Sequence, residues 1–260
     1  MAPSKLDNTH ILIFGGSSGL GHTTASQILS YSTPSTLTLV SSNPAKLAAA
    51  ASRLSPLSSP PTTIATLTID LSDLPNLRQN LPTLLDTATS TSANKITHLI
   101  YTADGASPPP PFPETQVADI TAQLSLRAYA PLILASILRS HAHIAASPDT
   151  SITFTNGSSS HRPMPGWAVA DAASGAMEGM VRGLAVDFAP VRVNLVSSGP
   201  VSTELFRTLP EETVELFRSK CLTGRIGRPE DVAEAYLYLM KDGNVTGTTL
   251  FTEGGRILAP

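Results

Sequence analysis

Residues 11–21 read Ile-Leu-Ile-Phe-Gly-Gly-Ser-Ser-Gly-Leu-Gly, an apolar run that passes directly into a glycine-rich turn. The run that ends at Phe14 predicts a buried strand, and the residues from Gly21 onward predict a helix. Glycines at this junction allow a tight turn and close approach of a pyrophosphate, and the helix N-terminus supplies N–H groups and a positive dipole. The sequence therefore predicts a dinucleotide site formed by Gly15, Ser17, Ser18, Gly19, Leu20 and Gly21.

Short apolar runs and helical stretches alternate along the rest of the chain. Strands are expected at residues 11–14, 37–40, 64–69, 99–102, 152–155, 191–196 and 248–251, and helices at 21–31, 44–54, 77–89, 114–139, 172–188 and 229–240. This order predicts a single α/β domain over residues 1–260, a Rossmann-like doubly wound parallel sheet with helices on both faces. Two stretches rich in Pro and Ser, 52–63 and 107–113, are expected to be loops, with prolines 108–111 forming a stiff spacer or bordering a substrate pocket.

Composition excludes several classes of function. A formal charge of −3 gives no basic stripe for nucleic acid, and no apolar run near twenty residues predicts a membrane span. The single Cys221 forms no internal disulfide, and the N-terminus lacks the apolar core of a signal peptide, so a cytoplasmic location is expected. His141 and His143 have no Cys or carboxylate cluster beside them, so we expect an exposed loop and no metal site.

The end of the second predicted strand carries no carboxylate. Ser41, Ser42 and Asn43 stand there, followed by Lys46, so a 2′-phosphate meets hydroxyls, an amide and a cation. The pattern favours NADP(H) over NAD(H), although the same residues also suit a serine-rich turn that caps the next helix. Asp70, after the third strand, either accepts a hydrogen bond from the adenine amino group or caps the following helix.

The chain resembles the short-chain dehydrogenase/reductase family from about residue 9 to residue 256. Gly15, Gly19 and Gly21 fit the family's T-G-x-x-x-G-x-G motif with Phe14 in place of Thr, and residues 197–203, 224–230 and 253–255 resemble its later signatures. The resemblance implies that Val201 and Thr203 contact the nicotinamide carboxamide. It also implies a homodimer or homotetramer, and it maps the catalytic serine to Ser158, within the run Ser158 to Ser160 whose register is open.

The family's Tyr-x-x-x-Lys motif is missing. Asp171 stands at the Tyr position and Gly175 at the Lys position, while Ser125 replaces a structural Asn, with Arg127 two residues on. The family's Tyr gives a proton to the alkoxide formed from a ketone, and an ionised Asp171 is a poor substitute. A carboxylate facing the nicotinamide would instead stabilise a cation such as an iminium, which needs no proton on reduction. Arg127 either pairs with Asp171 or binds a substrate carbonyl.

Two further features concern the expected substrate cleft. Gly175, Gly179 and Gly183 share one helix face, which suits close packing, including the family's dimer contact, and also enlarges the cleft where Lys is lost. Trp167 follows Pro165-Gly166 and suits stacking on an aromatic substrate or anchoring of the loop.

Asp171, Gly175, Arg127 and the Pro-Gly-Trp loop resemble an atypical fungal branch, the bifunctional reductase/Diels-Alderases of the malbrancheamide and paraherquamide type. The resemblance implies NADPH-dependent reduction of a cyclic iminium, a polycyclic alkaloid precursor, coupled to a stereoselective intramolecular 4+2 cycloaddition that forms a bicyclo-2.2.2-diazaoctane. Two alternatives stay open. One is a carbonyl reductase that uses Tyr101 or Tyr129 as proton donor, and the other is a non-enzymatic NADP-binding module.

Overall fold

The computed structural model describes residues 4–105, 112–140, 142–204 and 206–259. Seven parallel strands form one sheet in the order β3-β2-β1-β4-β5-β6-β7. They are β1 (His10–Phe14), β2 (Thr36–Ser41), β3 (Thr63–Thr68), β4 (His98–Tyr101), β5 (Ser151–Gly157), β6 (Arg192–Ser198) and β7 (Thr249–Thr252). Every residue of β1 is buried, because both faces of a doubly wound sheet are covered. The predicted fold class is confirmed.

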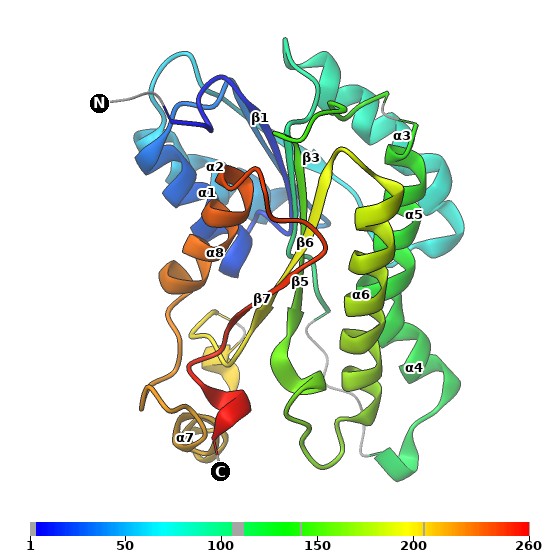
Figure 1. Ribbon diagram of the computed structural model, residues 1–260, viewed down its shortest axis with the longest axis vertical. Coiled ribbons are helices and arrows are strands. Elements are labelled where there is room, and N and C mark those ends of the chain that lie inside the picture. Colours follow the sequence, from blue (N-terminus) through cyan, green and yellow to red (C-terminus); the bar gives the residue numbers. More distant parts are fainter. Residues whose placement is uncertain (1–3, 106–111, 141, 205, 260) are drawn as a thin grey trace.

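Helices cover both faces of the sheet (Figure 1). One face carries α1 (Gly19–Tyr31), α2 (Pro44–Leu54) and α8 (Pro229–Lys241), and the other carries α3 (Leu74–Ser90), α4 (Val117–Leu124), α5 (Ala130–Leu138) and α6 (Ala168–Asp187). Alternate residues of β1 therefore enter two separate cores. Ile11 and Ile13 pack on the α1 and α8 side, and Leu12 and Phe14 pack on the α3 and α5 side.

The predicted helix over 114–139 is divided in the structure. A 3-10 turn, η2 (Phe112–Glu114), precedes α4, and a π-helical turn, η3 (Ser125–Tyr129), separates α4 from α5. Asp119 accepts a hydrogen bond from the Gln116 N–H at 2.8 Å and so fixes the start of α4. Pro131 has no N–H and therefore begins a new helical segment.

Length and composition alone would let the run Val117–Leu138 cross a membrane, which the sequence analysis did not expect. In the structure α5 packs against α3 and contributes Ala130, Leu134, Ala135 and Leu138 to the core of that face. The shorter α4 packs against α6 and leaves Val117 and Ile120 exposed. The run is therefore divided between α5, which belongs to the core, and α4, which lies at the surface of the domain.

Other differences concern shorter elements. The predicted loop 52–63 is in part helical, because α2 continues to Leu54 and the 3-10 turn η1 (Ser55–Leu57) follows. The helix α7 (Glu211–Ser219) was not predicted. Prolines 108–111 lie outside the described residues. The remaining short turns are η4 (Ser158–Ser160), η5 (Phe206–Thr208) and η6 (Arg256–Leu258).

Candidate active site

A cavity of about 1650 Å³ opens at the carboxyl ends of the strands, where a doubly wound sheet places its ligands. The glycine turn after β1 forms part of its wall, and Trp167 and residues of α7 form another part. A pocket for one small ligand has roughly 300–1,000 Å³. The cavity therefore has room for a dinucleotide and a second molecule.

The glycine turn lines this cavity through Gly15, Ser17, Ser18, Gly19 and Leu20. Gly15 has a φ of +84°, and a Cβ there would lie 2.6 Å from Thr102 Oγ1. Gly21 is not among the lining residues. A Cβ at Gly21 would lie 2.5 Å from the Gly15 carbonyl oxygen, so this glycine serves the close packing of α1 against the turn rather than ligand contact.

The end of β2 presents polar groups to the cavity. Ser41, Ser42, Asn43 and Lys46 all line it. Ser17 Oγ donates to Ser41 Oγ at 3.0 Å, which ties this strand end to the glycine turn. Asn43 also caps α2, since its Oδ1 accepts from the Lys46 N–H at 2.9 Å. Asn43 therefore both caps α2 and faces the cavity.

A second cation approaches from the last turn of α2. Arg53 Nη2 lies 3.5 Å from the Ser17 carbonyl oxygen, and its Nε lies 3.4 Å from His22 Nε2. Sequence reasoning missed Arg53, because this residue follows Asn43 by ten positions. Only the direction of α2 brings its side chain close to the glycine turn.

Asp70 lines the cavity and accepts from both the N–H and the hydroxyl of Ser72, at 2.9 and 2.6 Å. Asp73, not Asp70, occupies the N-cap position of α3, so the alternative role of Asp70 as that helix's cap is wrong. Val201 and Thr203 also line the cavity. A Cβ at Gly19 would lie 3.7 Å from Thr203 Cγ2, so the glycine turn and the 197–203 segment face each other.

A carboxylate and a guanidinium meet in the wall of the cavity. Arg127, in the π-helical turn, forms an ion pair with Asp104 at 2.8 Å and a hydrogen bond with Gln123, and all three side chains line the cavity. The sequence left two partners open for Arg127, Asp171 or a substrate carbonyl. Sequence reasoning considered no third. It missed Asp104, a single acidic residue after β4 without a motif of its own.

Asp171 and Gly175 do not face the cavity. From α6 the lining residues are Ala170 and Ser174, each one position earlier. Consecutive helical residues point about 100° apart, so this single step turns both predicted residues away. Asp171 Oδ1 is buried without a hydrogen-bond partner among the described residues, and Gly175 is exposed with open space around it. The expectation that Gly175 enlarges the cleft is not met.

Aromatic residues form the wall near Trp167. Its indole lies edge-on to Phe217 of α7 with ring centroids 6.3 Å apart, and Phe217 packs on Phe206 at 5.8 Å. All three line the cavity, together with Leu209. Because α7 is short and rich in charge, its apolar side gave no clear signal in the sequence.

Neither alternative proton donor is suitably placed. The Tyr101 hydroxyl donates to the Leu126 carbonyl at 2.8 Å, and burial raises the pKa of Tyr101 far above its usual range. Tyr129 is exposed and is not among the lining residues. Ser158 is buried, lines the cavity and begins η4.

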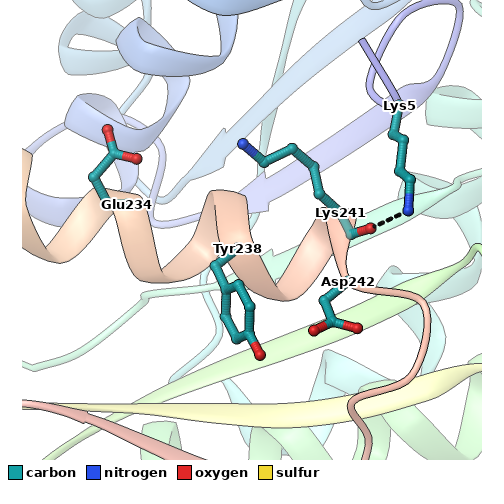
Figure 2. A pocket seen from close by; sticks show the side chains of 5 residues that line it. All are labelled: Lys5, Glu234, Tyr238, Lys241 and Asp242. Carbon is teal, nitrogen blue, oxygen red and sulfur yellow. Dashed lines mark hydrogen bonds between the residues drawn. The ribbon is translucent and has the colours of Figure 1, made fainter.

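Other sequence features lie away from the cavity. His143 Nε2 is 2.7 Å from Asp86 Oδ1, and His141 lies outside the described residues. A second, open hollow lies at the amino-terminal end of the sheet, where Lys5 Nζ donates to the Lys241 carbonyl at 2.9 Å beside Tyr238 and Asp242 (Figure 2). It is remote from the strand ends that position ligands.

A family model described as an SDR-like Rossmann domain matches residues 2–259. This chain belongs to the short-chain dehydrogenase/reductase family. The short-chain dehydrogenase/reductase malC of Malbranchea aurantiaca is 40% identical and is matched over 99% of this chain and 100% of its own length. The family member ATR9 of Stachybotrys chlorohalonatus is 34% identical over 95% of this chain and 96% of its own length. The solved structure of MalC Reductase/Diels-Alderase superposes with a TM-score of 0.90 over 98% of this chain and 97% of that one.

Two registers of the family's catalytic spacing fit this chain. The family's Ser, Tyr and Lys follow one another at intervals of 13 and 4 residues, and the lining residues Gly157, Ala170 and Ser174 have the same spacing. Under this register the three family positions hold Gly, Ala and Ser. As a short-chain dehydrogenase/reductase, the chain is an oxidoreductase whose fold takes a nicotinamide cofactor, and it lacks the family's proton donor in either register.

Proposed function

We propose that this protein reduces a cyclic iminium with NADPH. The observation that carries the proposal is the composition of the cavity wall, to which α6 contributes Ala170 and Ser174 and neither a Tyr nor a Lys, and which includes the carboxylate of Asp104. Ketone reduction requires a proton in the transition state, whereas an iminium accepts hydride and becomes a neutral amine. Because the cavity wall lacks the family's proton-donating Tyr, we infer an iminium substrate rather than a ketone.

The chain's own residues hold and orient the reactants. The glycine turn and the N-terminus of α1 accommodate the pyrophosphate, and Val201 and Thr203, which line the same cavity, bind the nicotinamide carboxamide. NADPH supplies the hydride when bound. The Asp104 carboxylate stabilises the substrate cation, Arg127 holds Asp104 in place, and Ser158 offers a hydroxyl to a polar substrate atom. The role first assigned to Asp171 thereby passes to Asp104.

The preference for NADP(H) is part of the proposal. Ser41 and Ser42 offer hydroxyls, Asn43 offers an amide, and Lys46 adds positive charge at the strand end. Arg53 adds a second positive charge behind Ser17. A carboxylate that would repel a 2′-phosphate is not among the residues that line this end of β2.

The second part of the proposal is a 4+2 cycloaddition of the reduced product to a bicyclo-2.2.2-diazaoctane, with the product enantiomer selected by the cavity. It is supported by the 40% identity to MalC Reductase/Diels-Alderase and by the aromatic wall of Trp167, Phe206 and Phe217. A cycloaddition needs a diene and an alkene held close in a folded conformation, and a shaped apolar wall supplies that constraint without an acid or a base.

We also infer a cytoplasmic homo-oligomer, a dimer or a tetramer, that acts on a polycyclic alkaloid precursor. A non-enzymatic NADP-binding module is disfavoured, because the chain belongs to a family of oxidoreductases. A carbonyl reductase that uses Tyr101 is disfavoured, because that hydroxyl is buried and bonded to a backbone carbonyl.

The test is NADPH oxidation by the purified protein with a cyclic iminium and, separately, with a panel of ketones. Oxidation with the iminium alone is expected. Asp104→Asn, which keeps the shape and removes the charge, should lower kcat/KM by about 100-fold or more, while Asp171→Asn should retain most of the activity. Loss of activity in Asp171→Asn alone would return the catalytic role to Asp171.

Two further results would decide between the alternatives. Tyr101→Phe should retain turnover, because its hydroxyl is bonded to Leu126 and not directed to a substrate. If NADPH binds and no iminium oxidises it, the proposed iminium reduction fails, and oxidation of NADPH by a ketone would assign a carbonyl reductase instead.

A further inference from the structure

Arg256 is a buried cation in the wall of the cavity. It begins η6, directly after the Gly254-Gly255 turn that follows β7, and its relative exposure is 4%. Arg256 Nη2 donates to the Arg162 carbonyl oxygen at 2.8 Å. No other hydrogen bond of its guanidinium and no ion pair within 4.0 Å is found among residues 4–105, 112–140, 142–204 and 206–259.

Burial of a guanidinium is costly unless its donors are bonded, and it carries five N–H donors. Burial lowers the pKa of Arg256, and the positive charge of Arg162 lowers it further. The negative charges of Asp171 and Glu253 act in the opposite direction, and Asp171 Oδ1 is itself buried without a hydrogen-bond partner in the described chain. An arginine so placed stays protonated at neutral pH. The positive charge of Arg256 is therefore balanced by carboxylates at a distance. Most of its N–H donors, however, have no hydrogen-bond acceptor among the described residues.

Arg192 shows how this fold satisfies a buried arginine that is purely structural. It is 3% exposed, and its guanidinium donates to backbone carbonyls of Pro148, Leu239 and Met240 at 2.7, 2.6 and 2.9 Å. Arg192 does not line the cavity, whereas Arg256 does. The comparison indicates that the unused donors of Arg256 serve a ligand.

The surroundings of Arg256 indicate what kind of ligand this is. Arg162, whose carbonyl accepts its hydrogen bond, lies in the loop that leads to Trp167, and Cys221, which follows α7, lies against the Gly254 turn directly before Arg256. The aromatic wall formed by Trp167, Phe206 and Phe217 belongs to the same cavity. A ligand that fills this part of the cavity has an aromatic or apolar body.

We propose that Arg256 binds an acceptor oxygen, a carboxylate or an amide carbonyl, on an aromatic substrate. The inference deepens the proposed function, and rests on it only for the assumption that the substrate occupies this cavity beside the dinucleotide. Carboxylate and carbonyl oxygens are the groups that a guanidinium recognises, and hydrogen bonds to a charged donor in a desolvated site are strong. Arg256 is thereby a substrate-positioning and specificity residue.

The test uses three indoles of similar size, indole-3-acetate, indole-3-acetamide and 3-ethylindole, titrated calorimetrically into the NADPH-saturated protein. At least one oxygen-bearing probe should bind about tenfold tighter than 3-ethylindole. If only indole-3-acetate binds more tightly than 3-ethylindole, Arg256 recognises a carboxylate. If indole-3-acetamide also binds more tightly, Arg256 accepts a neutral carbonyl as well. Equal affinity for all three overturns the inference without recourse to any variant.

Arg256→Gln should abolish the preference and leave the affinities for 3-ethylindole and NADPH unchanged. Arg162→Gln is the matched control, because it removes a neighbouring positive charge and keeps the backbone carbonyl that Arg256 uses, so the preference should survive there. A preference that persists in Arg256→Gln overturns the inference. If the probes bind through Arg256 and no iminium is reduced, the proposed reduction fails and the binding site stands.

Discussion

Ser41 decides the charge that the end of β2 presents to a nucleotide. Its hydroxyl bonds to Ser17, and both residues line the cavity, with Lys46 close by along the chain. An aspartate at this position is the side chain that NAD-dependent Rossmann folds use to hold a ribose 2′-hydroxyl and to repel a 2′-phosphate.

We therefore expect Ser41→Asp to raise the Kd for NADPH at least about tenfold and to lower that for NADH, since a like charge next to phosphate is unfavourable. Fluorescence titration with both cofactors measures the two constants. Ser41→Asn has nearly the same shape without the charge and should keep the NADPH preference. An unchanged preference in Ser41→Asp would place the 2′-phosphate elsewhere.

His98 makes the stability of the fold depend on pH. It is buried in β4 with Nδ1 2.9 Å from Ser151 Oγ, and burial lowers its pKa to about 3, with a smaller contribution from the charge of Arg192. In the unfolded chain the pKa returns to about 6.5. The unfolded state therefore binds more protons at every pH between these values. The stabilisation is complete above pH 6.5 and is lost as the pH falls toward 3.

Between pH 7 and pH 5 this residue should lower the free energy of unfolding by about 2 kcal/mol. Urea unfolding of the wild type and of His98→Gln at both pH values gives the difference, in which contributions from His10 and from the carboxylates cancel. An equal pH dependence in the two proteins would show that His98 is protonated without unfolding.

The residues of α6 predicted for the site differ by one position from those that line the cavity. The serine run 158–160 fits the family spacing in more than one register, and the sequence carries neither Tyr nor Lys to choose between them. The choice is made by the direction in which α6 leaves its loop, and that direction follows from packing at Trp167, Phe217 and the sheet. Local spacing therefore located the correct turn of the helix, but not the side that faces the cavity.

At the scale of elements, the β1–α1 unit depends on close contact between the backbone of the glycine turn and the first turn of α1. Gly21 lies in the first turn of α1, and a Cβ there would come within 2.5 Å of the Gly15 carbonyl and 2.6 Å of Thr102 Oγ1. Neither the backbone oxygen nor the short Thr side chain can move away without displacing the turn.

Gly21→Ala should therefore weaken NADPH binding at least about tenfold and destabilise the fold by about 1–3 kcal/mol. Gly243→Ala is the control, because a Cβ at this exposed loop position meets nothing within 4 Å. Calorimetric titration and thermal unfolding measure both effects. Tight NADPH binding by Gly21→Ala would mean that the turn tolerates displacement.

Helices and strands were predictable where the residue composition and the spacing of apolar residues indicate the same element. All seven strands lie within two residues of their expected positions. The inner strands are largely apolar runs because the sheet is covered on both faces, whereas the edge strands β3 and β7 are partly exposed and are marked by their β-branched residues. The π-helical turn at 125–129 and α7 were not predictable from such runs. The first depends on a hydrogen-bond shift within a continuous helical pattern, and the second exposes most of a short, charged helix.

For the whole molecule, one face of α6 remains uncovered. Gly175, Gly179 and Gly183 are exposed with open space around them, and Val186, three residues after the last glycine, is 77% exposed. Successive glycines one turn apart let another helix approach closely, and an exposed apolar residue beside them adds area to bury. This face is suited to contact with a second copy of the chain, as in the homo-oligomers that this family forms.

Gly179→Lys should therefore convert the oligomer to a smaller species, because a long charged side chain would stand in the centre of the contact. Lysine has a higher helix propensity than glycine, by roughly 1 kcal/mol, so the helix itself should be no less stable. Sedimentation velocity of the wild type and variant measures the change, and Gly243→Lys, which adds the same charge at an exposed loop, should leave the mass unchanged. Since Gly179 lies away from the cavity, NADPH affinity should persist in the smaller species. An undiminished mass for Gly179→Lys would show that the oligomer, if one forms, uses a different face.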